Sequence, residues 1–138
     1  MNVRLNPYLN FRNSAEEALK LYQSVFGGEL TLSRFGENGM AEDPADSNKI
    51  MHGQLEAPNG MTLMASDAPP GIPLSEGGSI SVSLSGDDEA TLRGYWNGLA
   101  AGGQVTVPLE KAPWGDTFGM LIDKFGIAWL VNIAGPQS

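Results

Sequence analysis

The sequence contains no cysteine, and this absence excludes several classes of function at once. Without thiols there is no disulfide, zinc–thiolate site, iron–sulfur cluster or cysteine nucleophile. The first seven residues contain no apolar core of a signal peptide. No apolar run approaches the roughly 18 residues that a membrane span needs. We therefore expect a cytoplasmic protein that does not enter a membrane.

Basic residues are also scarce. Eight Lys and Arg stand against 16 Asp and Glu, which gives a formal net charge of −8. The cations are scattered along the chain, so no basic stripe is available to displace counterions from a polyanion. Nucleic acid is therefore not expected as a partner, and the acidity is interpreted as a source of solubility.

The first half of the chain predicts one strand, one helix and three further strands. After a short strand at Tyr8–Phe11, Ser14 and Glu17 are spaced as a capping box that starts a helix. Apolar residues recur at three- and four-residue steps up to Phe26, and Gly27 then ends the helix. Further strands are predicted at 30–35, 50–57 and 61–66, with a long polar loop over 36–49.

The same order restarts after a Pro/Gly-rich stretch at 67–78. Ile80, Val82 and Leu84 alternate with serines in a predicted strand whose apolar face should carry a helix. Acidic residues 87–89 start that helix, where its dipole favours negative charge. The remaining strands are predicted at 104–109, 114–123 and 127–133.

An internal repeat supports this division. The segment 27–31, Gly-Gly-Glu-Leu-Thr, recurs at 102–106 as Gly-Gly-Gln-Val-Thr, each time directly after a helix. A unit of about 60 residues can hardly bury its own sheet, so two units must pack together. We therefore predict one α+β domain over 1–138, built from two βαβββ modules that form a curved mixed sheet around a cavity. Module 1 covers about 5–67, the linker 68–78, and module 2 about 79–134.

Several motifs resemble the glyoxalase/bleomycin-resistance (vicinal-oxygen-chelate) superfamily, and more narrowly its PhnB-like branch. They are Pro7-Tyr8-Leu9-Asn10-Phe11, Leu21-Tyr22 through Gly27-Gly28, Met51-His52-Gly53, Trp114-Gly115-Asp116 with Phe118-Gly119, and Asp123-Lys124-Phe125-Gly126 with Trp129. The resemblance implies a glyoxalase-like fold, a small-molecule ligand and a homodimer. Members of the branch carry a demethylubiquinone methyltransferase-like label. The sequence, however, has no glycine-rich loop within a parallel αβ unit to hold S-adenosylmethionine.

The resemblance also locates the superfamily's usual metal ligands. The matching positions fall near Asn6, Met64, Ser79 and Leu130, which are poor ligands, while a stable divalent site needs several converging imidazoles or carboxylates. We therefore expect no metal and no other cofactor. A shifted metal site that uses Glu56 or Asp67 remains the alternative, and it would support a glyoxalase-type lyase, isomerase or dioxygenase.

Alternation along the strands points a mixed set of side chains toward the cavity. The predicted ligand-binding residues are Tyr8, Asn10, Gln54, Thr62, Met64, Ser79, Ser81, Trp114, Phe118 and Leu130. Hydroxyl, amide, aromatic and thioether groups together suit a small, partly apolar ligand. Trp114 and Phe118 are interpreted either as one wall of the pocket or as ordinary core packing.

His52 is the only histidine and the one candidate catalytic residue. It is predicted either as a cavity-facing hydrogen-bond donor or general base, or as a structural histidine tied to a carboxylate or a backbone carbonyl. The leading hypothesis is a protein that binds or converts a small metabolite without metal. Whether the ligand is sequestered, as bleomycin-resistance proteins do, or turned over is left open.

Overall fold

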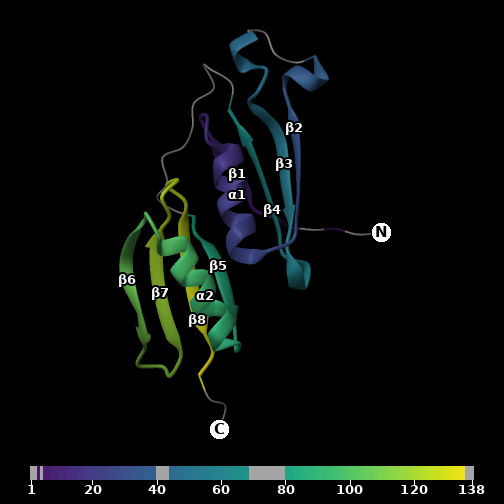
Figure 1. Cartoon of the computed structure of the whole chain (residues 1–138). Helices are drawn as coiled ribbons and strands as arrows, with labels where there is room; N and C mark the ends of the chain where they lie inside the picture. The colour runs from purple at the N-terminus through teal and green to yellow at the C-terminus, as the bar shows by residue number, and fades with distance from the viewer. Residues whose placement is uncertain (1–2, 4, 40–43, 69–79, 136–138) are drawn as a thin grey trace. The chain divides into compact units, whose positions relative to one another are not determined.

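The chain divides into two compact units, Met1–Ser75 and Glu76–Ser138, which we call module 1 and module 2 (Figure 1). The computed structural model describes residues 3, 5–39, 44–68 and 80–135. Ser79 and most of the expected linker therefore lie outside the described residues. Each module is described by itself.

Module 1 is a four-stranded mixed sheet with one helix on one face. Its elements are β1 (Tyr8–Phe11), α1 (Ala15–Phe26), β2 (Glu29–Arg34), β3 (Ile50–Glu56) and β4 (Thr62–Asp67), with short 3-10 turns at Gly36–Asn38, Pro44–Asp46 and Pro58–Gly60. The strand order is β1-β4-β3-β2; β1 runs parallel to β4, and the other pairs are antiparallel.

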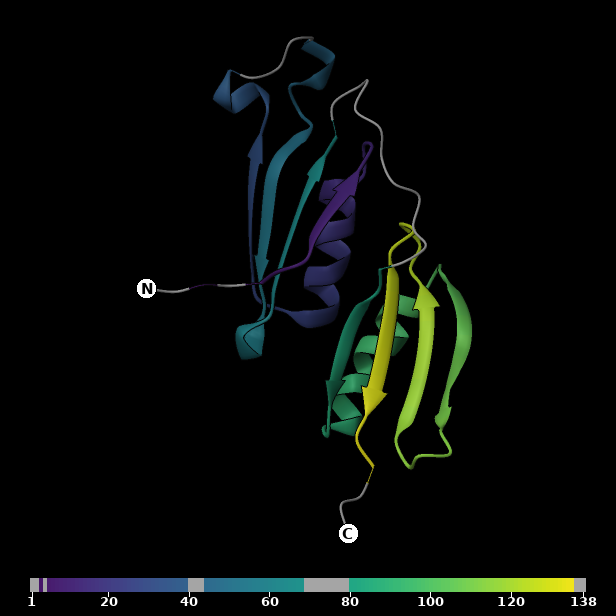
Figure 2. The same ribbon diagram turned by 180° about the vertical axis from the view of Figure 1, so that it is seen from behind.

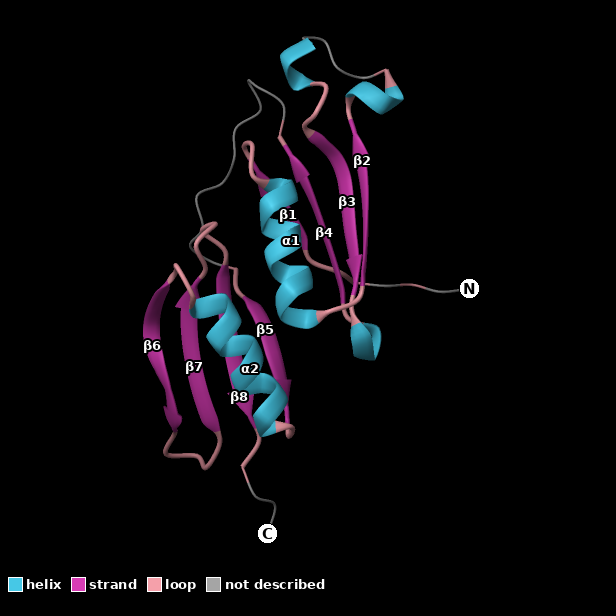
Figure 3. Cartoon of the chain, in the orientation of Figure 1, coloured by secondary structure: helices cyan, strands magenta, loops and turns pink. Residues whose placement is uncertain are grey.

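Module 2 repeats this arrangement. Its elements are β5 (Val82–Gly86), α2 (Glu89–Ala100), β6 (Gln104–Lys111), β7 (Thr117–Ile122) and β8 (Ala128–Ile133), in the sheet order β5-β8-β7-β6. Each module therefore places one helix on one face of an open sheet (Figure 3), and Figure 2 shows the strands in front of the helices. The predicted α+β fold of two βαβββ modules is confirmed.

Strand registers make positions in the two modules equivalent. Tyr8 pairs with Met64 in module 1 as Ser83 pairs with Leu130 in module 2. Gly53 pairs with Ala65 as Gly119 pairs with Val131. The residues His52, Gln54 and Glu56 on β3 thus correspond to Phe118, Met120 and Ile122 on β7.

The repeated double glycine has a packing reason. A Cβ atom at Gly28 would collide with the carbonyl oxygen of Glu56, and one at Gly103 with that of Ile122. In both modules the chain that leaves the helix thus passes directly against the end of the third strand, where only glycine fits. The sequence repeat marks this shared close approach.

Two local predictions were wrong. The side chain of Ser14 makes no capping hydrogen bond. The buried carboxylate of Asp67 instead accepts from the Ala15 amide at 3.0 Å and from the Ile50 amide at 2.9 Å. Ile80 lies before β5 and is 81% exposed, so it carries no helix.

Candidate functional site

The helix-free face of module 1 gathers polar side chains from all four strands. Along β4, Leu63, Ala65 and Asp67 are buried, whereas Thr62, Met64 and Ser66 between them are half-buried. Strand pairing extends the second set across the sheet: Tyr8 and Gln54 both pair with Met64, Asn10 pairs with Ser66, and Thr62 pairs with Glu56. Five residues predicted from the sequence therefore share one surface: Tyr8, Asn10, Gln54, Thr62 and Met64.

Four of the side chains on this face form a chain of polar contacts. The Tyr8 hydroxyl lies 3.4 Å from His52 Nδ1, and His52 Nε2 lies 3.5 Å from Gln54 Oε1. Gln54 Nε2 donates to Glu56 Oε1 at 3.3 Å. If the Tyr8 hydroxyl donates to Nδ1, the imidazole proton sits on Nε2 and faces Gln54. Donors and acceptors then run in one direction and end on the Glu56 carboxylate.

His52 makes two polar contacts, both through its ring nitrogens. Its side chain is half-buried, and its ring centroid lies 5.8 Å from that of Tyr8. Gln54 stands between His52 and the Glu56 carboxylate. Both contacts of the imidazole are long for hydrogen bonds, so the ring is only loosely held in this geometry. A ligand that reaches the face can therefore compete for either ring nitrogen.

Strand β2 completes the face with residues that the sequence reasoning missed. Thr31 pairs with Gln54, and Ser33 pairs with His52. Both thus place a hydroxyl-bearing side chain beside the polar chain. Their alternation with Leu30 and Leu32 was the available signal, but only the pairing with β3 shows which residues they adjoin.

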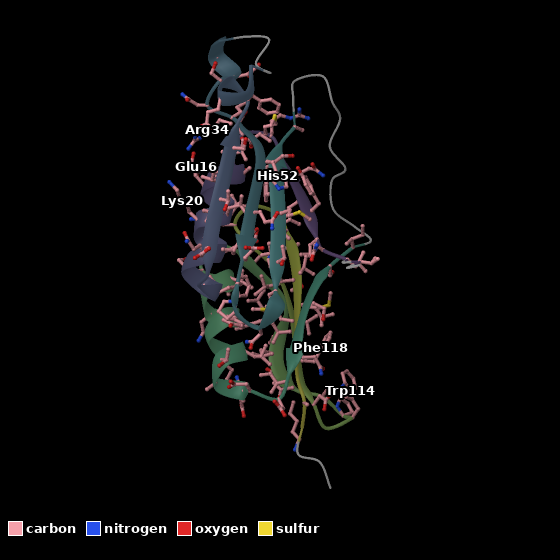
Figure 4. The ribbon with its side chains drawn as sticks, turned by 90° about the vertical axis from the view of Figure 1, so that its right-hand side faces the viewer. Glu16, Lys20, Arg34, His52, Trp114 and Phe118 are labelled. Atoms are coloured by element: carbon pink, nitrogen blue, oxygen red, sulfur yellow. The ribbon has the colours of Figure 1, made fainter. Side chains whose placement is uncertain are left out.

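The opposite side of module 1 carries an ion-pair cluster. Arg34 binds Glu16 through both terminal nitrogens, at 2.9 and 3.1 Å, and Lys20 lies 3.0 Å from the same carboxylate. The hydrogen bond from Arg34, helped by Lys20, lowers the pKa of Glu16 from 4.5 to about 2. Figure 4 shows these three side chains on one side of the module and His52 on the other. The charge of Arg34 is thus neutralised away from the polar face.

The predicted site residues of module 2 fall on a more apolar surface. Phe118 and Leu130 are half-buried on the helix-free face, where Leu130 pairs with Met120. Trp114 is 64% exposed and meets Phe118 edge-on, with ring centroids 5.9 Å apart (Figure 4). Ser81 is exposed just before β5, and Ser79 lies outside the described residues.

Carboxylates in module 2 hold turns together. Asp116 accepts from the Gly135 amide at 2.8 Å and from Asn132 Nδ2 at 3.1 Å, and these bonds lower its pKa. Buried Asp123 accepts from the amides of Phe125 and Ile127 and from Trp129 Nε1. These acceptors are already engaged by the protein's own donors.

The described positions expected for a metal hold poor ligands. Asn6 is half-buried, while Met64 and Leu130 present a thioether and an alkyl group. Within the part of the chain that the structure describes, no three His, Asp or Glu side chains are grouped as a metal site requires. The chemistry that these residues offer is hydrogen bonding.

No described helix is long and apolar enough to cross a membrane.

Comparisons with known proteins cover nearly the whole chain. A family model described as 3-demethylubiquinone-9 3-methyltransferase matches residues 3–132. Protein YjdN from Escherichia coli (strain K12) is 30% identical over 145 residues, which cover 96% of this chain and 97% of the relative.

Solved structures also resemble this chain over nearly its whole length. Protein PA1353 from Pseudomonas aeruginosa is 38% identical with a TM-score of 0.82, covering 96% of this chain and 98% of that one. A putative 3-demethylubiquinone-9 3-methyltransferase, PhnB protein, from Bacillus cereus is 25% identical with a TM-score of 0.75, covering 96% and 100%. A glyoxylase/bleomycin resistance protein/dioxygenase domain from Frankia sp. EAN1pec has a TM-score of 0.64 at 18% identity, covering 99% of each chain. This last likeness concerns the fold alone.

Proposed function

Since the chain belongs to the PhnB-like 3-demethylubiquinone-9 3-methyltransferase family and has the glyoxalase-like fold, we propose that it binds a small polar metabolite on the helix-free face of module 1. The observation that carries this proposal is the chain of contacts from Tyr8 through His52 and Gln54 to Glu56. The face offers a ligand a hydroxyl, an imidazole, an amide and a carboxylate within one patch. Small-molecule sites combine apolar surface with a few convergent polar groups of this kind.

The role that we assign to His52 is hydrogen bonding to the ligand, with proton transfer in any reaction that follows. An imidazole can both donate and accept a proton, so it is a residue of this face suited to act as an acid or a base. The loose contacts to Tyr8 and Gln54 leave it able to exchange a protein partner for a ligand atom. Binding comes first in this proposal, and turnover is the additional step.

The family description implies S-adenosylmethionine, and the described residues do not fit that cofactor. Such sites use a glycine-rich loop between a strand and a helix of a parallel sheet. Here β1 reaches α1 through Arg12, Asn13 and Ser14, and the Ala15 amide of the helix is taken by Asp67. At the start of α2, the Asp88 carboxylate accepts from the Thr91 amide. We therefore derive no methyl-transfer step for this protein.

A screen for stabilising ligands tests the proposal. A metabolite that binds only the native state must raise the melting temperature, so a thermal-shift screen of polar metabolites should yield ligands. For such a ligand, His52→Ala should weaken binding roughly ten- to hundredfold, as expected when a buried hydrogen-bond partner is lost. The control is Lys20→Ala, which alters the side of module 1 away from His52 and should leave the affinity unchanged. Equal affinities for the wild type and His52→Ala would contradict the proposal.

Two further properties belong to the same proposal. We expect binding without a divalent metal, which elemental analysis of the purified protein checks; stoichiometric nickel, zinc, iron or manganese would instead favour a glyoxalase-type lyase or isomerase. We also expect a homodimer, because two-fold isologous dimers are the commonest assembly. Its expected location is the cytoplasm. Light scattering that gives a monomer mass at micromolar concentration would refute the dimer.

A further inference from the structure

A groove on the helix side of module 2, between α2 and β6, has no part in the function proposed above. It encloses about 340 Å³ and is lined by Arg93, Trp96, Asn97, Val105, Pro108 and Leu109. This volume lies at the lower end of the range for small-molecule pockets, about 300–1,000 Å³. All its lining residues belong to module 2, so its geometry does not depend on module 1.

Helix α2 contributes one wall of the groove. Arg93 and Asn97 lie one helical turn apart on α2 and are exposed, whereas Trp96 beside Asn97 is buried. The helix thus presents one ring and two polar side chains to the groove.

The edge strand contributes the second wall. The pairing of β6 with β7 shifts register between Val105 and Val107 and again between Val107 and Glu110. Such bulges bend an edge strand and twist it away from regular pairing. Figure 1 shows β6 at the outer edge of its sheet, next to β7.

An indole contributes to the lining. Trp96 is only 8% exposed, and a Cβ added at Gly119 would lie 2.7 Å from its Cη2 atom. The absence of a side chain at Gly119 thus lets the indole lie close to β7. The indole with Val105, Pro108 and Leu109 supplies the apolar part of a lining that is about half polar, and this part suits a planar ring.

The Arg93 guanidinium offers unused hydrogen-bond donors at the rim. Arg93 Nε donates to Glu89 Oε2 at 2.8 Å. That bond leaves the two terminal guanidinium nitrogens of Arg93 without a hydrogen-bond partner among the described residues. These nitrogens form the fork that binds carboxylates bidentately, and the lining residues of the groove include no acid.

We propose that this groove is a second small-molecule site, which takes a planar aromatic carboxylate with its ring against Trp96 and its carboxylate on Arg93. The Asn97 side-chain amide, one helical turn from Arg93, supplies a further donor at the rim. The site is independent of His52.

The test uses naphthalene-2-carboxylate as the probe and the full-length protein. Titration followed by amide and indole NMR shifts should move the signals of Trp96, Asn97 and Leu109, while those of Tyr8 and His52 stay in place. Arg93→Leu removes the guanidinium and should weaken binding at least about tenfold, the loss expected for one charge-assisted hydrogen bond. The neutral naphthalene-2-carboxamide should bind the wild type more weakly by a similar factor.

Lys20→Leu is the matched control, because Lys20 pairs with Glu16 four residues earlier on α1 as Arg93 pairs with Glu89 on α2. It removes the same charge from a helix surface and should leave the affinity unchanged. Probe shifts confined to Trp114 or to the polar face of module 1 would overturn the proposal. So would groove signals that move with protein concentration alone, because a second copy of the chain would then occupy the groove.

Discussion

The two modules share their strand order but differ in the chemistry of their helix-free faces. On β3 of module 1 these positions hold His52, Gln54 and Glu56, and on β7 of module 2 they hold Phe118, Met120 and Ile122. On the helix side the correspondence is closer, with Gly53 matching Gly119 and Gly28 matching Gly103. The glycines on the helix side are thus kept in both modules, whereas the positions on the other face are polar on β3 and apolar on β7.

The two modules also bury a carboxylate at different positions. Each contains one buried carboxylate among its described residues, Asp67 in module 1 and Asp123 in module 2. The position equivalent to Asp67 holds Ile133, and the one equivalent to Asp123 holds Ala57. Asp67 links the start of α1 to the start of β3, while Asp123 closes the turn between β7 and β8. The buried carboxylate therefore connects elements that are distant in sequence in module 1 and stabilises a local turn in module 2.

The largest expected effect comes from removing these carboxylates. Asp67→Ala removes the carboxylate that two buried amides bind, and Asp123→Ala removes the carboxylate bound by two amides and the Trp129 indole N–H. Each substitution should lower the free energy of unfolding by about 3 kcal/mol, because buried donors lose a charged acceptor. Urea titration measures the loss.

Hydrogen exchange separates the two roles. Asp67→Ala should speed exchange in the first turn of α1, more than 50 residues away in sequence from the substitution. Asp123→Ala should speed exchange only around the β7–β8 turn. Identical exchange patterns in the two variants would contradict a long-range role for Asp67 and a local role for Asp123.

The equivalent glycines give the next largest difference. A Cβ at Gly119 would lie 2.9 Å from the Leu109 Cα and 2.7 Å from Trp96 Cη2, so it meets backbone and a buried ring. At Gly53 it would meet chiefly the flexible end of the Leu19 side chain. Gly119→Ala should therefore cost about 2 kcal/mol and Gly53→Ala about 1 kcal/mol, both measured by urea titration. A larger loss at Gly53 would show that Leu19 is held as rigidly as Trp96.

The elements of the fold could be predicted because their signals are local. Apolar spacing predicted both helices, and the recurrence of Gly27-Gly28 as Gly102-Gly103 predicted the repeat. The cap of α1 could not be predicted in this way. Ser14 and Glu17 have the spacing of a capping box, but Asp67 reaches the Ala15 amide from the end of β4. That contact depends on β1 and β4 pairing in parallel, which no local pattern reveals.

The candidate site was predicted in part for the same reason. Alternation correctly placed Tyr8, Gln54 and Met64 on one face, because a strand has a fixed period of two. Thr31 and Ser33 were missed because their neighbours depend on the register between β2 and β3. Ile80 continued the alternation of Val82 and Leu84, but the strand begins only at Val82.

The ion pairs of the two helices allow a smaller test based on pH. The folded-state pKa of Glu16 is about 2, below its ordinary value of 4.5, so ionised Glu16 stabilises the fold above pH 4.5. That contribution should be lost as the pH falls from 4.5 toward 2. Glu16→Gln should cost about 1 kcal/mol at neutral pH, a value reduced for the partial exposure of the pair, and almost nothing near pH 2.

The Glu89–Arg93 pair on α2 is the control, because it lies within one helix and is more exposed. Glu89→Gln should change the free energy of unfolding at neutral pH by less than Glu16→Gln does, as expected for an exposed pair. Urea titrations at neutral and acidic pH measure both variants. A Glu16→Gln loss that does not shrink with acid would exclude the ion pair as its cause.

The smallest effect on stability is expected at His52. Its ring is half-buried and makes only long contacts, so His52→Ala should cost well under about 1 kcal/mol. Phe118→Ala at the equivalent position should cost more, about 1 kcal/mol, because an apolar ring in contact with Trp114 is removed. A large loss for His52→Ala in urea would assign the histidine to the framework of module 1 rather than to its binding face.

The placement of tryptophan makes module 2 optically distinct. All three tryptophans, Trp96, Trp114 and Trp129, lie within Glu76–Ser138. Trp129 is fully buried with its N–H on Asp123, and Trp114 is exposed. Indole fluorescence therefore reports the packing of module 2 alone, whereas far-UV ellipticity sums the backbone of both modules. When the two signals are recorded in the same denaturation, a fluorescence midpoint that differs from the ellipticity midpoint identifies modules that unfold separately.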